Sequence, residues 1–278
     1  PRVMSLVLFT SMVGLLIAPE QVSFITSAIS LFAVAMGAGA AGALNMWYES
    51  DLDALMTRTC LRPIPTGKVQ KKQALWFGVV LSVISITMLY YTANPVSSLL
   101  LATTIGFYFF IYTIWLKRRT PQNIVIGGAA GALPPVIGWA ISTNSISIES
   151  VILFLIIFIW TPSHFWALSL YKSSDYKKAK IPMLPITAGI KKTKLNILIY
   201  SLLMAPIVAL PFFFNFGSLI YLILSSVMTF YYVYLCVLLF KEKNNKASNI
   251  IARKIFVYSI FYLFFIFLLI LADNLIQY

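Results

Sequence analysis

Long apolar segments separated by short polar breaks divide this chain almost from end to end. A bilayer core about 30 Å thick needs about 20 apolar residues per helix, and backbone groups in lipid must be hydrogen-bonded within their own segment. The pattern therefore predicts helices rather than strands. It predicts nine transmembrane helices, at residues 3–18, 23–47, 73–92, 95–116, 123–142, 148–171, 195–214, 217–240 and 251–272.

The composition supports a membrane protein. Of the 278 residues, 60% are hydrophobic and only 10% are charged, which is too apolar for a soluble domain of this size. No low-complexity linker interrupts the pattern, and we expect one all-α domain over residues 1–278 with its helices around a central cavity. The chain opens with Pro1 rather than Met, so we expect a little sequence to precede it, and we recognise no cleavable signal peptide.

Positive charge is confined to alternate loops. The 21 Lys and Arg residues lie at the N-terminus or in or beside the loops after the second, fourth, sixth and eighth predicted helices. The positive-inside rule places these loops and the N-terminus in the cytoplasm, or in the matrix of a mitochondrion. Topology and anionic lipid therefore account for the net charge of +13, and we expect membrane lipid, not nucleic acid, as the partner of these side chains.

Four of the eight acidic residues lie where predicted helices reach the cytoplasmic side: Glu49, Asp51, Asp53 and Asp175. Carboxylates there are costly unless they are paired, solvated or bound to a cation. In a continuous second helix, Asn45, Glu49 and Asp53 fall within about 80° of one another, whereas Asp51 points away and receives a lesser role unless the helix breaks early. Amide and carboxylate oxygens without His or Cys suit Mg²⁺.

Basic residues follow this acidic stripe. Arg58 and Arg62 lie four positions apart, and Lys68 comes after two prolines and a glycine that should end the helix. A Mg²⁺ ion on the acids, with guanidinium groups nearby, would clamp a diphosphate and stabilise it as a leaving group. The alternative is that these charges form intrahelical pairs, such as Asp53 with Arg58, and anchor the helix at the interface.

The sixth predicted helix carries a second polar group. If it persists to residue 175, His164, Tyr171 and Asp175 lie within about 40° of one face, with the charged group at the mouth and room for a flat aromatic molecule deeper down. His164 is the one histidine of the chain. It either hydrogen-bonds a neighbouring helix, or acts as an axial ligand of haem iron or as a wall of an acceptor pocket.

Glycines in the second and fifth predicted helices are a further pattern. Small residues let two helices approach closely in a membrane. We therefore assign to helix packing the residues Gly37, Gly39, Gly42, Gly127, Gly128, Gly131 and Gly138.

The polar residues of the second helix resemble the first motif of the UbiA superfamily of intramembrane prenyltransferases. The resemblance rests on the spacing Asn45-x3-Glu49-x3-Asp53-x4-Arg58-Thr59-x2-Arg62-Pro63. The superfamily usually has Asp as its second acid, and Glu49 keeps a carboxylate at that position. Its second motif, a pair of Asp residues, corresponds here to Tyr171-x3-Asp175, which leaves fewer metal ligands on the sixth helix.

Within the superfamily, the chain is most similar to the protohaem IX farnesyltransferases, or haem O synthases. Three segments carry this similarity: residues 49–59; Lys117-Arg118-Arg119-Thr120-Pro-Gln-Asn123 with Pro134-Pro135; and Thr161-Pro-Ser-His164-Phe-Trp166 through to Pro182-Met-Leu-Pro. Members that prenylate hydroxybenzoate or naphthoate resemble the first segment but lack the Pro-x-His-Phe segment. The likeness to this branch therefore rests on the fifth and sixth helices.

This resemblance implies transfer of a farnesyl group from farnesyl diphosphate to a vinyl group of haem B, with water completing a hydroxyethylfarnesyl side chain. It implies Mg²⁺ on Asn45, Glu49, Asp53 and Asp175, with Arg58 as a further catalytic residue. The implied substrate-binding residues are Arg62, Lys68, Lys117, Arg118, Asn123, His164, Tyr171, Lys172 and Lys178. Aromatic faces that could stabilise an allylic cation or stack on the macrocycle are Tyr108, Tyr112, Trp160 and Trp166.

The resemblance also implies a setting, and it leaves alternatives open. Haem O serves respiratory oxidase biogenesis, so we expect a bacterial inner membrane, an active site facing the cytoplasm, and haem-modifying or oxidase-assembly proteins as partners. The close alternative is another prenyltransferase of the superfamily with a hydroxybenzoate or naphthoate acceptor. More distant alternatives are an ion-coupled carrier, because polar groups at helix ends also mark ion sites, and a non-catalytic assembly scaffold.

Overall fold

The computed structural model describes residues 2–57 and 59–277, and every regular element in this part of the chain is helical. Eight segments are long and apolar enough to cross a membrane: α2 (Phe24–Tyr48), α4 (Lys71–Thr92), α5 (Pro95–Gly106) continued by η1 (Phe107–Leu116), α6 (Asn123–Ala132) with α7 (Pro134–Thr143), α8 (Ile148–Tyr171), α11 (Gly189–Phe213), α12 (Leu219–Lys241) and α13 (Asn245–Gln277). The all-α class and the multi-pass character predicted from the sequence are confirmed.

The remaining helices are short. The first predicted span corresponds to α1 (Arg2–Leu16), an apolar helix that is shorter than the other eight segments. Three others connect membrane helices at one end of the bundle: α3 (Ser50–Leu55), α9 (Ser173–Lys178) and α10 (Leu184–Thr187).

Local sequence signals explain where several of these helices begin. The Ser23 hydroxyl accepts a hydrogen bond from the Thr26 amide at the start of α2, and the Asn94 side chain accepts one from the Ser97 amide at the start of α5. These side chains satisfy amides that the first turn leaves free. In the fifth predicted helix, Pro134 has no N–H to donate to the preceding turn, and the helix divides there into α6 and α7.

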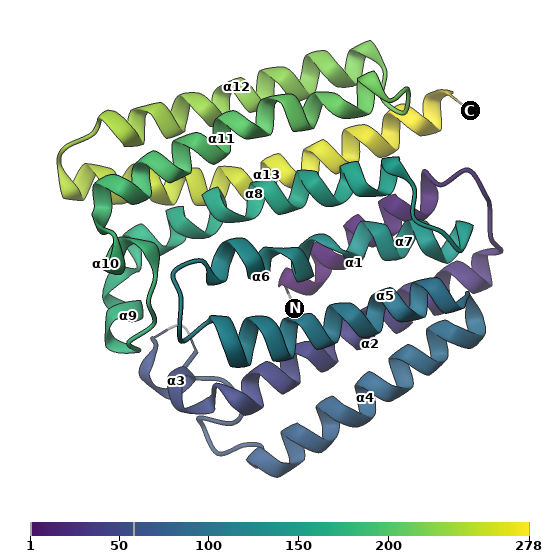
Figure 1. Ribbon diagram of the computed structural model, residues 1–278, viewed down its shortest axis with the longest axis horizontal. Coiled ribbons are helices and arrows are strands. Elements are labelled where there is room, and N and C mark those ends of the chain that lie inside the picture. Colours follow the sequence, from purple (N-terminus) through teal and green to yellow (C-terminus); the bar gives the residue numbers. More distant parts are fainter. Residues whose placement is uncertain (1, 58, 278) are drawn as a thin grey trace.

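The membrane helices form two groups with a third layer between them (Figure 1). In Figure 1, α8, α11, α12 and α13 lie together in the upper half, and their buried side chains form the largest hydrophobic cluster. The helices α2, α4 and α5 lie in the lower half and share a second cluster with α7. Between the groups lie α1, α6 and α7. A third, small cluster joins α3, α6 and α9 at the end where the bundle holds its polar residues.

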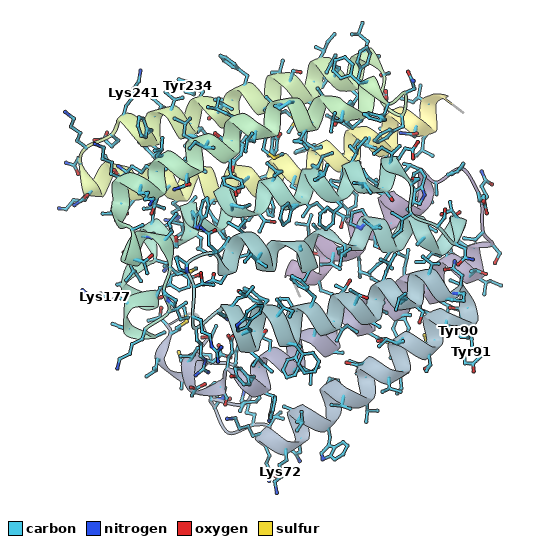
Figure 2. All side chains as sticks on the ribbon, in the orientation of Figure 1. Lys72, Tyr90, Tyr91, Lys177, Tyr234 and Lys241 are labelled. Carbon is cyan, nitrogen blue, oxygen red and sulfur yellow. The ribbon has the colours of Figure 1, made fainter. Side chains whose placement is uncertain are left out.

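Basic loops lie at that same end. In Figure 2, Lys177 and Lys241 are labelled at the left of the bundle and Lys72 at the bottom, at the start of α4, whereas Tyr90 and Tyr91 lie at the right, toward the opposite end of α4. This placement follows from helices that cross the bundle in alternating directions. Large apolar side chains such as Trp76 and Phe230 point outward, where lipid, and not water, is their solvent.

The helices α1 and α7 approach each other closely at two glycines. A Cβ atom added at Gly138 would lie 1.8 Å from the Ser11 carbonyl oxygen, and one added at Gly14 would lie 2.1 Å from the Pro135 carbonyl oxygen. The packing role predicted for Gly138 is therefore confirmed. Cβ atoms at Gly37, Gly127 and Gly128 would also meet neighbouring side chains, and one at Gly39 would make an ordinary contact. The same interpretation is wrong for Gly42 and Gly131, where nothing lies within 4 Å of the added Cβ.

These two kinds of glycine predict opposite effects on stability. Gly138→Ala must push α1 away from α7, which costs about 1–3 kcal/mol of folding free energy. Gly131→Ala meets no neighbour and removes a poor helix former, so it should raise stability slightly. We expect a lower melting temperature for Gly138→Ala and an equal or higher one for Gly131→Ala, measured by tryptophan fluorescence in detergent. Equal melting temperatures for the two variants would contradict the close contact.

Candidate active site

The polar end of α2 is not a continuous helix. The helix ends at Tyr48, Glu49 caps it with its amide bonded to the Asn45 carbonyl oxygen, and α3 starts at Ser50. The helix expected over Asn45, Glu49 and Asp53 is thus interrupted at Glu49, although the Asp53 amide still donates to the Glu49 carbonyl oxygen. Glu49 and Asp53 are buried and Asp51 is exposed, as the helical spacing predicts.

Glu49 lies at the centre of a buried polar group. Glu49 is 1% exposed, and its Oε2 accepts hydrogen bonds from Asn45 Nδ2 at 2.9 Å and from the Lys117 ammonium. Its Oε1 has no hydrogen-bond partner within the described part of the chain. A buried carboxylate oxygen without a partner is costly, and it is the kind of atom that a cation satisfies.

The helix that carries Lys117 has an unusual backbone. Residues Phe107–Leu116 form the π-helix η1, in which the hydrogen bonds reach five residues back. Thr113 Oγ1 donates to the Tyr108 carbonyl oxygen at 2.9 Å, and it accepts a hydrogen bond from Asn45 Nδ2 at 3.1 Å. The π-helix thereby delivers both Thr113 and Lys117 to the end of α2.

Asp53 is held from the loop that follows α3. The Nη1 atom of Arg62 lies 3.0 Å from Oδ1 and 2.8 Å from Oδ2 of Asp53. The Thr59 hydroxyl also donates to the Asp53 carbonyl oxygen at 3.0 Å, which fixes the loop against α3. Arg58, the partner that the sequence-based alternative gave to Asp53, lies outside the described residues.

A cavity of about 60 Å³ opens where these groups meet. We call it the acidic pocket. Its polar lining is Glu49, Asp53, Thr59, Arg62, Lys117 and Asn123, and its remaining lining is Leu52, Met56, Tyr112, Ile124, Phe165, Tyr176, Ile181 and Met183. Each acid in the lining is paired with one cation, Glu49 with Lys117 and Asp53 with Arg62, so the charges of these four side chains cancel.

Asn123 supports this pocket from α6. Its Nδ2 donates to the carbonyl oxygens of Thr120, at 2.7 Å, and Lys117, at 3.4 Å, while its Oδ1 has no partner among the described residues. The bonds hold the loop between η1 and α6 closed, which keeps Lys117 over the pocket. Lys117 Nζ also lies 5.6 Å from the centre of the Tyr112 ring.

The second polar group is arranged differently from its sequence-based expectation. The helix α8 ends at Tyr171 and a new helix, α9, starts at Ser173, so the continuous helix that would align His164, Tyr171 and Asp175 does not form. Asp175 is buried, and its Oδ2 accepts a hydrogen bond from the Thr57 hydroxyl at 2.6 Å. That bond joins α9 to the loop after α3, next to the acidic pocket.

His164 lies inside the bundle and outside the lining of the acidic pocket. Its ring stacks between Trp160, at 4.2 Å, and Phe256, at 4.5 Å, and its Nδ1 is 2.6 Å from the Ser259 hydroxyl. Ser259 donates its own proton to the Phe256 carbonyl oxygen. His164 Nδ1 is therefore the donor in its bond to Ser259, which leaves Nε2 as the basic nitrogen of the neutral ring.

Other predicted substrate-binding residues lie at the same end of the bundle but on its surface. Lys68 and Lys172 are exposed, and Lys178 lines a second, more open cavity together with Arg118. Arg118 Nη2 donates to Asp51 Oδ1 at 2.8 Å and its Nη1 donates to Oδ2 at 3.1 Å. Burial opposes ionisation of Asp51, but the hydrogen bonds from Arg118 outweigh it and hold the pKa of Asp51 below its usual value.

The donor set of the acidic pocket fits a magnesium ion that shares its coordination with a ligand. Within residues 2–57 and 59–277, no three His, Cys, Asp or Glu side chains gather as a closed metal cage. Glu49 and Asp53 nevertheless line one cavity, and Glu49 Oε1 is unpartnered. Magnesium is commonly held by one or two carboxylates plus water and substrate phosphate, which is the arrangement that two acids beside two cations permit.

The sequence-based site omitted two threonines. Thr113 orients Asn45, and Thr57 holds Asp175. A signal for Thr113 was present, since it is the one threonine within the aromatic and aliphatic run Phe107–Leu116, which contains no serine. Thr57 had no comparable signal, because its partner Asp175 is 118 residues away along the chain.

Comparison with known proteins agrees with this geometry. Residues 7–271 match the profile of the UbiA prenyltransferase family. A relative from Pelagibacter ubique (strain HTCC1062), named protoheme IX farnesyltransferase, is 64% identical over 276 residues, which are 99% of this chain and 91% of the relative. A relative of the same name from Rhizobium rhizogenes (strain K84 / ATCC BAA-868) is 51% identical over 276 residues, or 99% of this chain and 86% of the relative.

Solved structures share the arrangement of helices. A digeranylgeranylglyceryl phosphate synthase superposes with a TM-score of 0.80 at 19% identity, over 97% of this chain and 93% of that one. A UbiA homologue from Archaeoglobus fulgidus, bound to DMAPP and Mg²⁺, superposes with a TM-score of 0.66 at 14% identity, over 94% of this chain and 98% of that one. Given the family profile and these relatives, the chain belongs to the UbiA prenyltransferase family.

Proposed function

We propose that this protein transfers a farnesyl group from farnesyl diphosphate to a vinyl group of haem B, with addition of water, to form haem O. The observation that carries the proposal is the acidic pocket, where two buried carboxylates and two cations converge and one carboxylate oxygen has no partner among the described residues. The relatives named protoheme IX farnesyltransferase, matched over 99% of this chain, support haem B as the acceptor.

Glu49 and Asp53 are the proposed ligands of Mg²⁺, and Asn45 and Asp175 remain the further ligands predicted from the sequence. When bound, Mg²⁺ neutralises negative charge on the diphosphate and thereby assists its departure. Asn45 also has a second role, since its amide nitrogen donates to Glu49 and keeps that carboxylate pointed at the pocket.

Lys117 and Arg62 are the proposed partners of the diphosphate. Each is partly exposed at the pocket, with side-chain exposures of 20% and 34%, so each can turn from its carboxylate to a phosphate oxygen. This exchange keeps every charge paired at each stage of binding, which avoids the large cost of an isolated buried ion. Arg58 and Lys68, from the same loop, are predicted to supply further positive charge.

The reaction then balances bond by bond. The bond between farnesyl C1 and the diphosphate oxygen breaks, and its electron pair leaves with the diphosphate. The vinyl π bond breaks and its electron pair joins farnesyl C1 to the terminal vinyl carbon. The water oxygen bonds to the inner vinyl carbon, and an O–H bond of that water breaks to release one proton. The ring of Tyr112 and the apolar walls formed by Met56, Phe165 and Met183 favour this course, because they offer an aromatic face to an allylic cation and limit its exposure to water.

The proposed setting is the cytoplasmic side of a bacterial inner membrane. The acidic pocket lies at the end of the bundle that carries the basic loops, and basic loops are retained on the cytoplasmic side. Both substrates are amphipathic, and this location lets their charged ends stay near water while the farnesyl chain enters the bilayer core. The product would serve the assembly of respiratory oxidases, with haem-modifying or assembly proteins as partners.

The reaction is tested with purified protein, haem B, farnesyl diphosphate and Mg²⁺, followed by mass detection of the extracted haem. We expect a product heavier than haem B by a farnesyl group plus water, abolished by EDTA. Glu49→Gln and Asp53→Asn should slow it by a factor of about 100 or more, because each removes a carboxylate that would hold the Mg²⁺ ion beside the leaving group. The control Glu149→Gln, at the opposite end of α8, should keep the wild-type rate.

Two outcomes would contradict the proposal. Transfer to hydroxybenzoate or naphthoate, and not to haem, would contradict the proposed acceptor, and no transfer by folded protein would contradict the proposed reaction.

Thr113 allows a test of how Glu49 is positioned. Because the Thr113 proton goes to the Tyr108 carbonyl oxygen, its oxygen accepts from Asn45 and fixes which way that amide faces. Thr113→Val removes this acceptor, so the Asn45 amide loses one of its two hydrogen bonds and is held less firmly against Glu49. We expect about a tenfold rise in the Mg²⁺ concentration for half-maximal rate, corresponding to the loss of one buried hydrogen bond. Thr113→Ser, which keeps the hydroxyl, should restore the wild-type value, and equal Mg²⁺ dependence in both variants would refute the positioning role.

A further inference from the structure

A second cavity adjoins the acidic pocket. Leu52 and Ile181 line both cavities, so the two share a wall. The second cavity, of about 320 Å³, is lined by Leu55 on its apolar side and by Arg118, Lys178 and Lys180 on its charged side. We call it the basic pocket.

The charge of the basic pocket is not balanced locally. No Asp or Glu is among the residues that line it, and within the described part of the chain neither Lys178 nor Lys180 makes an ion pair. Arg118 is shared with the exposed Asp51. Three cations around an opening with apolar walls form a site for a ligand that is both apolar and anionic.

The backbone of Lys180 gives independent support. Lys180 has φ = +52°, a left-handed conformation that side chains other than Asn and Gly rarely adopt. The other described non-glycine residues with positive φ are both asparagines, Asn144 and Asn215. A lysine is retained here at the residue that follows the cap of α9, a position where glycine or asparagine is ordinarily preferred. Strain of this kind is typical of residues kept for a function.

We propose that the basic pocket binds the propionate carboxylates of the porphyrin acceptor, an inference that rests on the proposed function and specifies how its second substrate is held. The vinyl groups and the propionates of haem B lie on opposite edges of the macrocycle. A vinyl group at the acidic pocket therefore directs the propionates away from it, across the wall of Leu52 and Ile181. Lys180 and Lys178 meet the carboxylates there, and the apolar wall contacts the ring.

Lys180→Asn is a sharp test, because asparagine accepts the left-handed backbone while the charge is lost. The purified variant should be at least as heat-stable as the wild type. The probes are haem B and its dimethyl ester, which has no free carboxylate, titrated by absorbance into protein in nanodiscs of uncharged lipid. Wild type should bind haem B about tenfold more tightly than the ester, the value of one charge-assisted contact. Lys180→Asn should lose most of that difference while its affinity for the ester stays unchanged.

The matched control is Lys177→Asn. Lys177 lies on α9, three residues before Lys180, and is exposed, but it points away from the bundle and does not line the basic pocket (Figure 2). The Lys177→Asn variant should bind haem B and the dimethyl ester as the wild type does. The inference would be overturned if Lys180→Asn kept the wild-type ratio of affinities for haem B and its dimethyl ester. It would also be overturned if Lys180→Asn lost affinity for haem B and for the ester to the same extent. A third result would also overturn the inference. If Lys180→Asn binds haem B as the wild type does, but anionic lipid added to the nanodiscs changes haem binding only in the wild type, the pocket would be assigned to a phosphate headgroup. Farnesylation of haem by the wild type in the same preparation shows separately whether the proposed function holds.

Discussion

The ion pair between Glu49 and Lys117 is the contact around which the site is assembled. It joins the end of α2 to the end of η1, two segments that are 68 residues apart. Burying such a pair is costly unless further hydrogen bonds complete it, and here the amide of Asn45 completes only one of the two oxygens of Glu49. The remaining oxygen is buried without a partner among the described residues, in a residue that lines the acidic pocket. A structural ion pair would gain by satisfying both oxygens, so the incomplete pairing favours a ligand as the missing partner.

Breaks in helices, rather than the helices themselves, place the functional groups. The break at Glu49 separates α2 from α3, and the break at Lys172 separates α8 from α9. The π-helix η1 adds a third irregularity beside them. Continuous helices would carry these residues along fixed faces into the lipid or the core, whereas short helices turn across the end of the bundle. The small hydrophobic cluster of α3, α6 and α9 then holds the turned segments together.

Much of the fold could be predicted from the sequence. The membrane segments are apolar over lengths that only spanning helices need, so their positions follow from hydropathy, and the break at Pro134 is where a proline would place one. The breaks at Glu49 and Lys172 were not predictable in this way, since no proline or glycine marks either position. They depend on tertiary contacts, such as that of Thr57 with Asp175.

The functional site, like the fold, was only partly predictable from the sequence. Motif spacing identified Asn45, Glu49 and Asp53, and the structure brings all three close to the acidic pocket. The partner of Asp53 could not be chosen from spacing, because Arg58 and Arg62 both follow it closely along the chain; the structure shows the contact of Arg62 with Asp53. The bond from Asn45 to Thr113 depends on a π-helix, whose register leaves no pattern in hydropathy.

The central claim is that Glu49 is completed by a divalent cation that arrives with a diphosphate. Electron paramagnetic resonance of Mn²⁺, used in place of Mg²⁺, measures this directly in purified protein with and without a non-reactive thio analogue of farnesyl diphosphate. The account predicts one Mn²⁺ ion per chain, bound more tightly when the analogue is present, and lost in Glu49→Gln with the analogue still present. Equal Mn²⁺ binding by the wild type and Glu49→Gln would contradict it.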